Sequence, residues 1–61
     1  MTYEQIAARL AIGPATVGDI VRAGANEGQI ADLIRAGIVV VLQFSEDNDA
    51  VILGGYATPA Q

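Results

Sequence analysis

The chain has 61 residues, enough for one domain with a small core, because a chain of this length buries only about 60% of the surface that its unfolded state exposes. It contains no Cys and no His, which excludes disulfides and the usual zinc sites as reinforcement. It is 52% hydrophobic and 16% charged, which is too apolar for a disordered tail. Stability must therefore come from good local helix chemistry or from burial against another chain.

The seven carboxylates outnumber the three cations, which are all Arg, and the formal net charge is -4. A nucleic-acid binder ordinarily carries a basic face, because neutralising phosphates supplies most of its affinity. No apolar run approaches the ~20 residues of a membrane-spanning helix, and the start of the chain lacks the plan of a signal peptide. We therefore expect a cytoplasmic protein of a bacterium or a phage-infected host, or part of a virion assembled there, with no membrane partner.

The first predicted helix covers residues 3–11. Its apolar positions have the spacing of one helical face and are Tyr3, Ile6, Ala7 and Leu10. Thr2 and Gln5 have the spacing of a capping box, in which each side chain bonds the other residue's backbone N–H.

The second predicted helix covers residues 17–23. Thr16 precedes it as a cap, Asp19 lies near its positive end, and Gly24 fits the position that stops it. Gly18 weakens this helix by roughly 1 kcal/mol relative to Ala, so packing has to support it.

The third predicted helix covers residues 27–36. Asn26 opens it, Gln29 follows three residues later, and Gly37 closes it. Its apolar stripe consists of Ile30, Leu33 and Ile34.

After the third helix the pattern becomes that of strands. Two β-branched, apolar runs at 38–44 and 50–53 flank the polar cluster 45–49, which predicts an antiparallel hairpin over about 38–56. The chain is therefore expected to form one α+β domain over residues 1–61, with three short helices followed by the hairpin.

The stretch from Tyr3 to Val21 resembles the helix-turn-helix of bacterial and phage regulators. The matching positions are Ile6, Ala7, Leu10, Ile12, Val17 and Ile20. With the third helix and the hairpin behind it, the whole chain is similar to a winged helix. The resemblance implies that the third helix is the recognition helix, that the hairpin is the wing, and that the protein is a DNA-binding transcriptional regulator. In that interpretation the protein dimerises through the hairpin and contacts DNA with Thr16, Arg22 or Arg35.

The charges depart from this pattern where DNA would bind. The wing tip carries Glu46, Asp47 and Asp49, which would repel a phosphate backbone. Each Arg falls in the last turn of a predicted helix, where a cation interacts favourably with the negative end of the dipole. We therefore favour a protein partner over DNA, because a fold does not fix a function.

The hairpin is apolar on both faces, whereas a half-buried hairpin should alternate with polar residues. One face of its first strand carries Ile38, Val40, Leu42 and Phe44, and the other carries Val39, Val41 and Gln43. Three short helices cover only one face, so the other face is expected to bind a protein partner or a second copy. The residues assigned to that contact are Val39, Val41, Ile52 and Tyr56. Alternatively, the helices curl over both faces, or Ile38 and Val39 belong to the exit of the third helix.

The residues that enzymes use near neutral pH are missing. There is no His, Cys or Lys, and Ser45 lies in a turn without a base. The acidic cluster lacks the glycine and the distal glutamate of a calcium loop, so a solvated turn is favoured over a metal site. Gly54 and Gly55 are typical of a bulge or a close backbone approach. The sequence predicts a non-enzymatic interaction module, without cofactor or small-molecule substrate, in an oligomeric or phage-type assembly or as an adaptor for a host protein.

Overall fold

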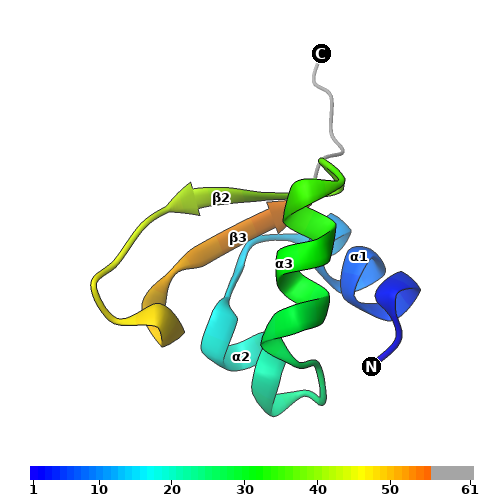
Figure 1. Cartoon of the computed structure of the whole chain (residues 1–61), viewed down its shortest axis with the longest axis horizontal. Coiled ribbons are helices and arrows are strands. Elements are labelled where there is room, and N and C mark those ends of the chain that lie inside the picture. Colours follow the sequence, from blue (N-terminus) through cyan, green and yellow to red (C-terminus); the bar gives the residue numbers. More distant parts are fainter. Residues whose placement is uncertain (56–61) are drawn as a thin grey trace.

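The computed structural model describes residues 1–55, which form three helices packed against one antiparallel sheet (Figure 1). The helices are α1 (Tyr3–Ile12), α2 (Val17–Arg22) and α3 (Glu27–Arg35). The strands are β1 (Ala15–Thr16), β2 (Val39–Gln43) and β3 (Ile52–Gly55), with a 3₁₀ turn, η1 (Asn48–Ala50), between β2 and β3. The predicted α+β class is confirmed, and the predicted positions of the three helices agree with the structure to within one residue at each end.

The expectation that all strands follow the helices was wrong for β1. This strand lies between α1 and α2 and pairs with β3, so that the sheet order is β1-β3-β2. Ala15 lies opposite Leu53, and Thr16 lies opposite Ile52. A strand of two residues carries no periodic signal of its own, because its pairing is supplied by a segment far along the chain.

Each helix begins at a side-chain cap. The Thr2 hydroxyl accepts a hydrogen bond from the Gln5 N–H at 3.1 Å, and Gln5 Oε1 accepts one from the Thr2 N–H at 2.9 Å. Asn26 and Gln29 form the same reciprocal pair at the start of α3. The Thr16 hydroxyl caps α2. The predicted capping residues are therefore confirmed, and they satisfy backbone donors that a bare helix end leaves unpaired.

Glycines end α2 and α3 in the left-handed conformation. Gly24 has φ +119° and Gly37 has φ +78°. The Gly37 N–H donates to the Ile34 carbonyl, and the Ile38 N–H donates to the Leu33 carbonyl, each at 3.0 Å. These two hydrogen bonds are those of the Schellman motif, and the same pair of hydrogen bonds ends α2. Both predicted stop residues are confirmed.

The core lies between the three helices and the inner face of the sheet. Its most deeply buried large side chains come from every layer of the fold and are Ile6, Leu10, Ile20, Val39 and Leu53. Among residues 1–55 no polar or charged side chain is buried. Burial of apolar surface is therefore the main contribution to the stability of this small domain.

Two glycines allow elements to approach one another closely. A Cβ added to Gly55 would lie 3.0 Å from the Leu10 carbonyl oxygen, so the end of α1 packs directly on β3. A Cβ added to Gly18 would lie 3.2 Å from both Cβ and the carbonyl oxygen of Asp49, so the η1 turn packs on α2. The close backbone approach expected at the Gly54–Gly55 pair is confirmed at Gly55, whereas the irregular register lies on β2, between Val41 and Gln43.

Candidate protein-contact surface

The hairpin presents its exposed apolar side chains on the face turned away from the helices and at the ends of β2. We call this surface the hairpin patch, and its residues are Ile38, Val40, Leu42, Phe44 and Ile52. Leu42 is 55% exposed and Phe44 is 81% exposed, whereas Val40 and Ile52 are half-buried. Monomeric proteins scatter single apolar residues over their surfaces, but several gathered on one hairpin are typical of a contact site.

Gly54 shapes the middle of the hairpin patch. It lies opposite Val40 in the register, and a Cβ added to it would lie 2.8 Å from Leu42 Cδ1. The Leu42 side chain therefore lies across β3 in the place that a Gly54 side chain would take. The result is an apolar surface with the backbone of β3 close to it, which suits contact with another chain.

The structure changes which hairpin residues are available to a partner. Val39 is only 1% exposed and belongs to the core, so its assignment to a partner-facing side was wrong. Val41 is half-buried and packs against the core, while Ile52 is half-buried on the opposite side. Tyr56 lies outside the described residues. The alternation predicted two apolar faces, but only the packing of the helices decides which face is covered.

A shallow hollow of about 180 Å³ adjoins the hairpin patch where the end of α1 meets the sheet. Its lining is Leu10, Ala11, Gly13, Pro14, Leu42, Gly54 and Gly55. None of these side chains is ionisable, and ligand sites ordinarily need a few converging polar groups to orient a small molecule. The hollow therefore extends the apolar surface and offers no group for catalysis.

The loop between β2 and β3 places its carboxylates beside the hairpin patch. Asp47 Oδ1 accepts a hydrogen bond from the Asp49 N–H at 3.0 Å, and the Ser45 hydroxyl accepts one from the Asp47 N–H at 3.2 Å. These bonds fix the turn from within. Across residues 1–55, no group of three or more acidic, His or Cys residues converges as a metal site.

The three Arg side chains make bonds within the chain. Arg22 Nη2 lies 2.8 Å from Asp19 Oδ1, and Arg35 Nη2 lies 2.6 Å from Asp32 Oδ1, in exposed ion pairs. Arg9 donates to a backbone carbonyl beyond α1 at 3.2 Å. Each lies in the last turn of its helix, as the sequence predicted. In both exposed pairs a carboxylate therefore lies next to the guanidinium.

The residues assigned to DNA contact have structural roles in this fold. The Thr16 hydroxyl caps α2 and is half-buried. The Arg22 guanidinium donates a hydrogen bond to Asp19. A Cβ added to Gly18 would lie 3.4 Å from the Arg22 guanidinium and 3.2 Å from Asp49, so the two residues flank the same position. The acidic loop therefore lies next to Arg22. A phosphate approaching this guanidinium would also meet carboxylates.

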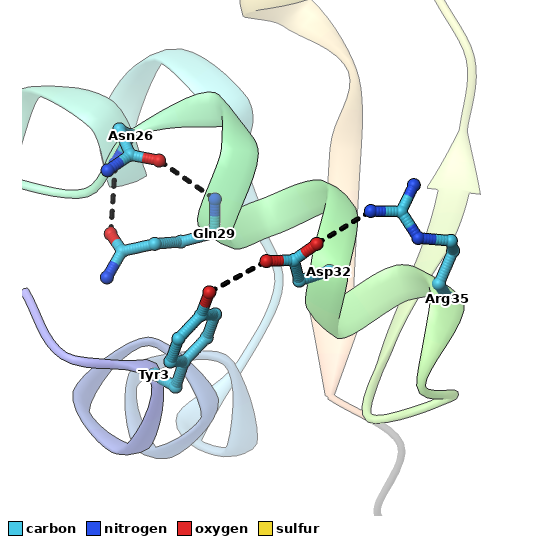
Figure 2. A network of polar contacts seen from close by, with 5 residues as sticks. All are labelled: Tyr3, Asn26, Gln29, Asp32 and Arg35. Carbon is cyan, nitrogen blue, oxygen red and sulfur yellow. Dashed lines mark hydrogen bonds and ion pairs between the residues drawn. The ribbon is translucent and has the colours of Figure 1, made fainter.

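A polar network joins α1 to α3 (Figure 2). The Tyr3 hydroxyl donates to Asp32 Oδ2 at 2.7 Å, while Asp32 Oδ1 accepts from Arg35. The hydrogen bond from Tyr3, together with that from Arg35, lowers the pKa of Asp32. The same bond and the Asp32 charge raise the pKa of Tyr3. Helical spacing predicted Tyr3 only as an apolar position of its helix, because its polar partner lies 29 residues away in the sequence.

The start of the chain is held against the turn between α2 and α3. The Met1 amino group donates to the Gly24 carbonyl at 2.9 Å, and Gln29 Nε2 donates to the Met1 carbonyl at 2.7 Å. Gln29 therefore uses its oxygen for the capping box and its nitrogen for Met1. These hydrogen bonds join the first residue of the chain to the turn before α3 and to α3 itself.

Within the described part of the chain, no helix has both the length and the apolar character needed to cross a bilayer. Comparisons with protein-family models, with curated proteins and with solved structures found no match. Any function is therefore argued from the surface itself.

Proposed function

We propose that this chain is a small non-enzymatic module that works through protein–protein contact. The observation that carries the proposal is the hairpin patch, in which Leu42 and Phe44 are more than half exposed on a domain with a small core. Covering such a surface removes apolar area from water and stabilises both the complex and the fold. The setting we favour is an oligomeric or phage-type assembly, or an adaptor that binds a host protein, in the cytoplasm of a bacterial or infected cell.

The proposed architecture is that of a winged helix used for protein contact. In this proposal α3 corresponds to the recognition helix and the hairpin to the wing, and the proposal is supported by the order of three helices before the two longer strands. The supporting feature is the apolar hairpin with its acidic loop, because a wing that contacts DNA needs cations. One architecture serves many unrelated functions, so this departure concerns the site and not the fold.

A DNA-binding regulator is the alternative function, and the exposed guanidinium groups of Arg22 and Arg35 are the observation that favours it. The two functions predict different responses to salt, because phosphate contacts release counterions. Under our proposal, fluorescence anisotropy detects no binding of duplex DNA at low salt. Affinity that falls steeply as salt is added would instead support the regulator.

The contact surface is tested by affinity capture from cells of the native source. The wild-type chain is compared with the double variant Leu42→Asp and Phe44→Asp, and with Ala31→Asp as the control. Ala31 is exposed on α3, so the control adds the same charged group away from the hairpin. We expect the wild type and the control to retain a common partner that the double variant loses. Retention of that partner by a folded double variant, checked by circular dichroism, would refute the proposed surface.

A further inference from the structure

β2 forms one margin of the sheet and has a free edge. The strand order is β1-β3-β2, so β2 pairs with β3 on one side, and no strand within residues 1–55 pairs with its other side (Figure 1). The strand Val39–Gln43 contains no charged residue and no Pro. Charged residues and Pro ordinarily protect an edge from pairing with another chain, as do β-bulges, and the irregular register of β2 lies between Val41 and Gln43, beyond the regular segment Val39–Val41.

We propose that a second copy of this chain occupies the edge, with its own β2 antiparallel to the first. This inference rests on the proposed protein-contact function and names the partner. A two-fold axis makes the contact self-complementary, so that both free edges are closed in one step and the two three-stranded sheets become one continuous sheet. The backbone N–H and C=O groups of each edge then find partners.

The charges at the two ends of β2 favour the antiparallel direction. One end leads into the acidic loop with Glu46 and Asp47, and the other begins four residues after Arg35, the last residue of α3. Antiparallel pairing brings the acidic loop of one copy towards Arg35 of the other, whereas parallel pairing would place two acidic loops side by side. The Arg35–Asp32 pair is exposed, so Arg35 can share its charge with an incoming carboxylate.

The apolar side chains determine how far the contact extends beyond the edge. A standard interface buries about 800 Å² per partner, which is roughly a fifth of the 3804 Å² that this chain exposes. A strand edge of five residues is too small for that area. The contact must therefore include the hairpin patch, where Leu42 and its neighbours from the two copies meet across strands about 4.8 Å apart.

Sedimentation equilibrium between 5 µM and 1 mM tests the pairing. We expect the wild type to be a dimer at the upper concentrations, with no larger species, because the two-fold contact is closed. Gln43→Lys places a cation on the free edge at an exposed position, and we expect it to raise the dimer dissociation constant at least about tenfold. Ala31→Lys adds the same charge on α3 and is expected to leave that constant unchanged.

A charge exchange tests the direction of the strands. Arg35→Glu alone and Glu46→Arg alone each place like charges together across the two-fold axis. Each is expected to weaken the dimer about threefold at low salt, since one screened surface pair contributes little. The double variant restores opposite charges and regains the wild-type affinity. Failure of the double variant to recover, with both single variants folded, would exclude the antiparallel arrangement.

The outcomes separate this inference from the function on which it rests. A wild-type chain that stays monomeric at 1 mM overturns the proposal that a second copy pairs with β2. A dimer whose dissociation constant Gln43→Lys does not raise overturns it as well. A monomer that still captures a partner through Leu42 and Phe44 would leave the contact function standing. In a mixture of isotope-labelled and unlabelled chains, nuclear Overhauser effects between the β2 strands of different copies are expected, and their absence from a dimer would refute strand pairing.

Discussion

Residues 1–37 complete their own hydrogen bonding at nearly every helix end and expose Tyr3, Ile12 and Ile34 at separate places on the helices, whereas residues 38–55 leave the edge of β2 without a strand partner in residues 1–55 and expose Ile38, Leu42 and Phe44 along one strand and its ends. Side-chain caps start all three helices, and Schellman motifs close two of them. In the hairpin, the helices cover only the inner face, and the outer face has no element packed on it within residues 1–55. We infer that residues 1–37 mainly establish the fold and that residues 38–55 provide the surface available to a partner.

The two faces of the hairpin provide the largest test of this comparison. Leu53 is 0% exposed on the inner face, and Leu42 is 55% exposed on the outer face. We expect Leu53→Ala to lower the free energy of unfolding by about 3 kcal/mol, because it removes buried methyl groups and leaves a cavity. Leu42→Ala should cost less than about 1 kcal/mol in the dissociated chain. Urea denaturation at low concentration measures both, and equal losses would show that the outer face belongs to the core.

The contact between α1 and β3 gives the next largest effect. Gly55→Ala forces a methyl group to within 3.0 Å of a backbone oxygen, and we expect a loss of about 2 kcal/mol. Gly13→Ala is the matched control, because Gly13 has extended backbone and no atom within 4 Å of an added Cβ. The control should stay within about 0.5 kcal/mol of the wild type. Thermal denaturation of the two variants distinguishes them, and a neutral Gly55→Ala would contradict the close packing.

Removing a cap tests whether the helical region depends on its local bonds. Asn26→Ala takes away one half of the α3 capping box and should cost about 1 kcal/mol. Asn48→Ala, in the hairpin loop, should change little, because the Asn48 side chain is exposed and makes no hydrogen bond within residues 1–55. Urea denaturation measures the free energy of unfolding of both variants, and equal losses would contradict the contrast between residues 1–37 and residues 38–55.

The Tyr3–Asp32 bond gives the smallest expected effect, which depends on pH. The lowered pKa of Asp32 means that its contribution is present above the ordinary value of 3.8 and is lost as pH falls through the folded-state pKa. The raised pKa of Tyr3 means that its contribution is present below the ordinary value of 10.0 and is lost as pH rises through the folded-state pKa. Tyr3→Phe should therefore be less stable than the wild type near neutral pH, with the gap narrowing in acid and in strong base. Melting temperatures at pH 3, 7 and 11 measure the gap, and a constant gap would rule out the bond.

The elements that the sequence predicted well are those with local signals. Thr2, Thr16 and Asn26 start helices through neighbours three residues away, and Gly24 and Gly37 end them through their own backbone freedom. Such signals are complete within one turn of the chain. They explain why the helices could be placed from the sequence alone.

The features that could not be predicted depend on distant partners. β1 exists only because Ala15 meets Leu53, and Tyr3 is polar in function only because Asp32 lies across from it. Val39 was assigned to the contact face because alternation divides a strand into two faces without saying which one the helices cover. The candidate surface itself was predicted as a hairpin, but its exposed residues were identified only once the packing was known.

Site-specific photo-cross-linking in cells of the native source tests the central claim that the hairpin is the contact surface. A photoreactive phenylalanine analogue replaces Phe44 in one variant and Glu27, at the exposed start of α3, in the other. We predict a protein adduct from position 44, of twice the chain mass if a second copy binds, and no adduct from position 27. Adducts to DNA from position 27, with none to protein from position 44, would contradict the account.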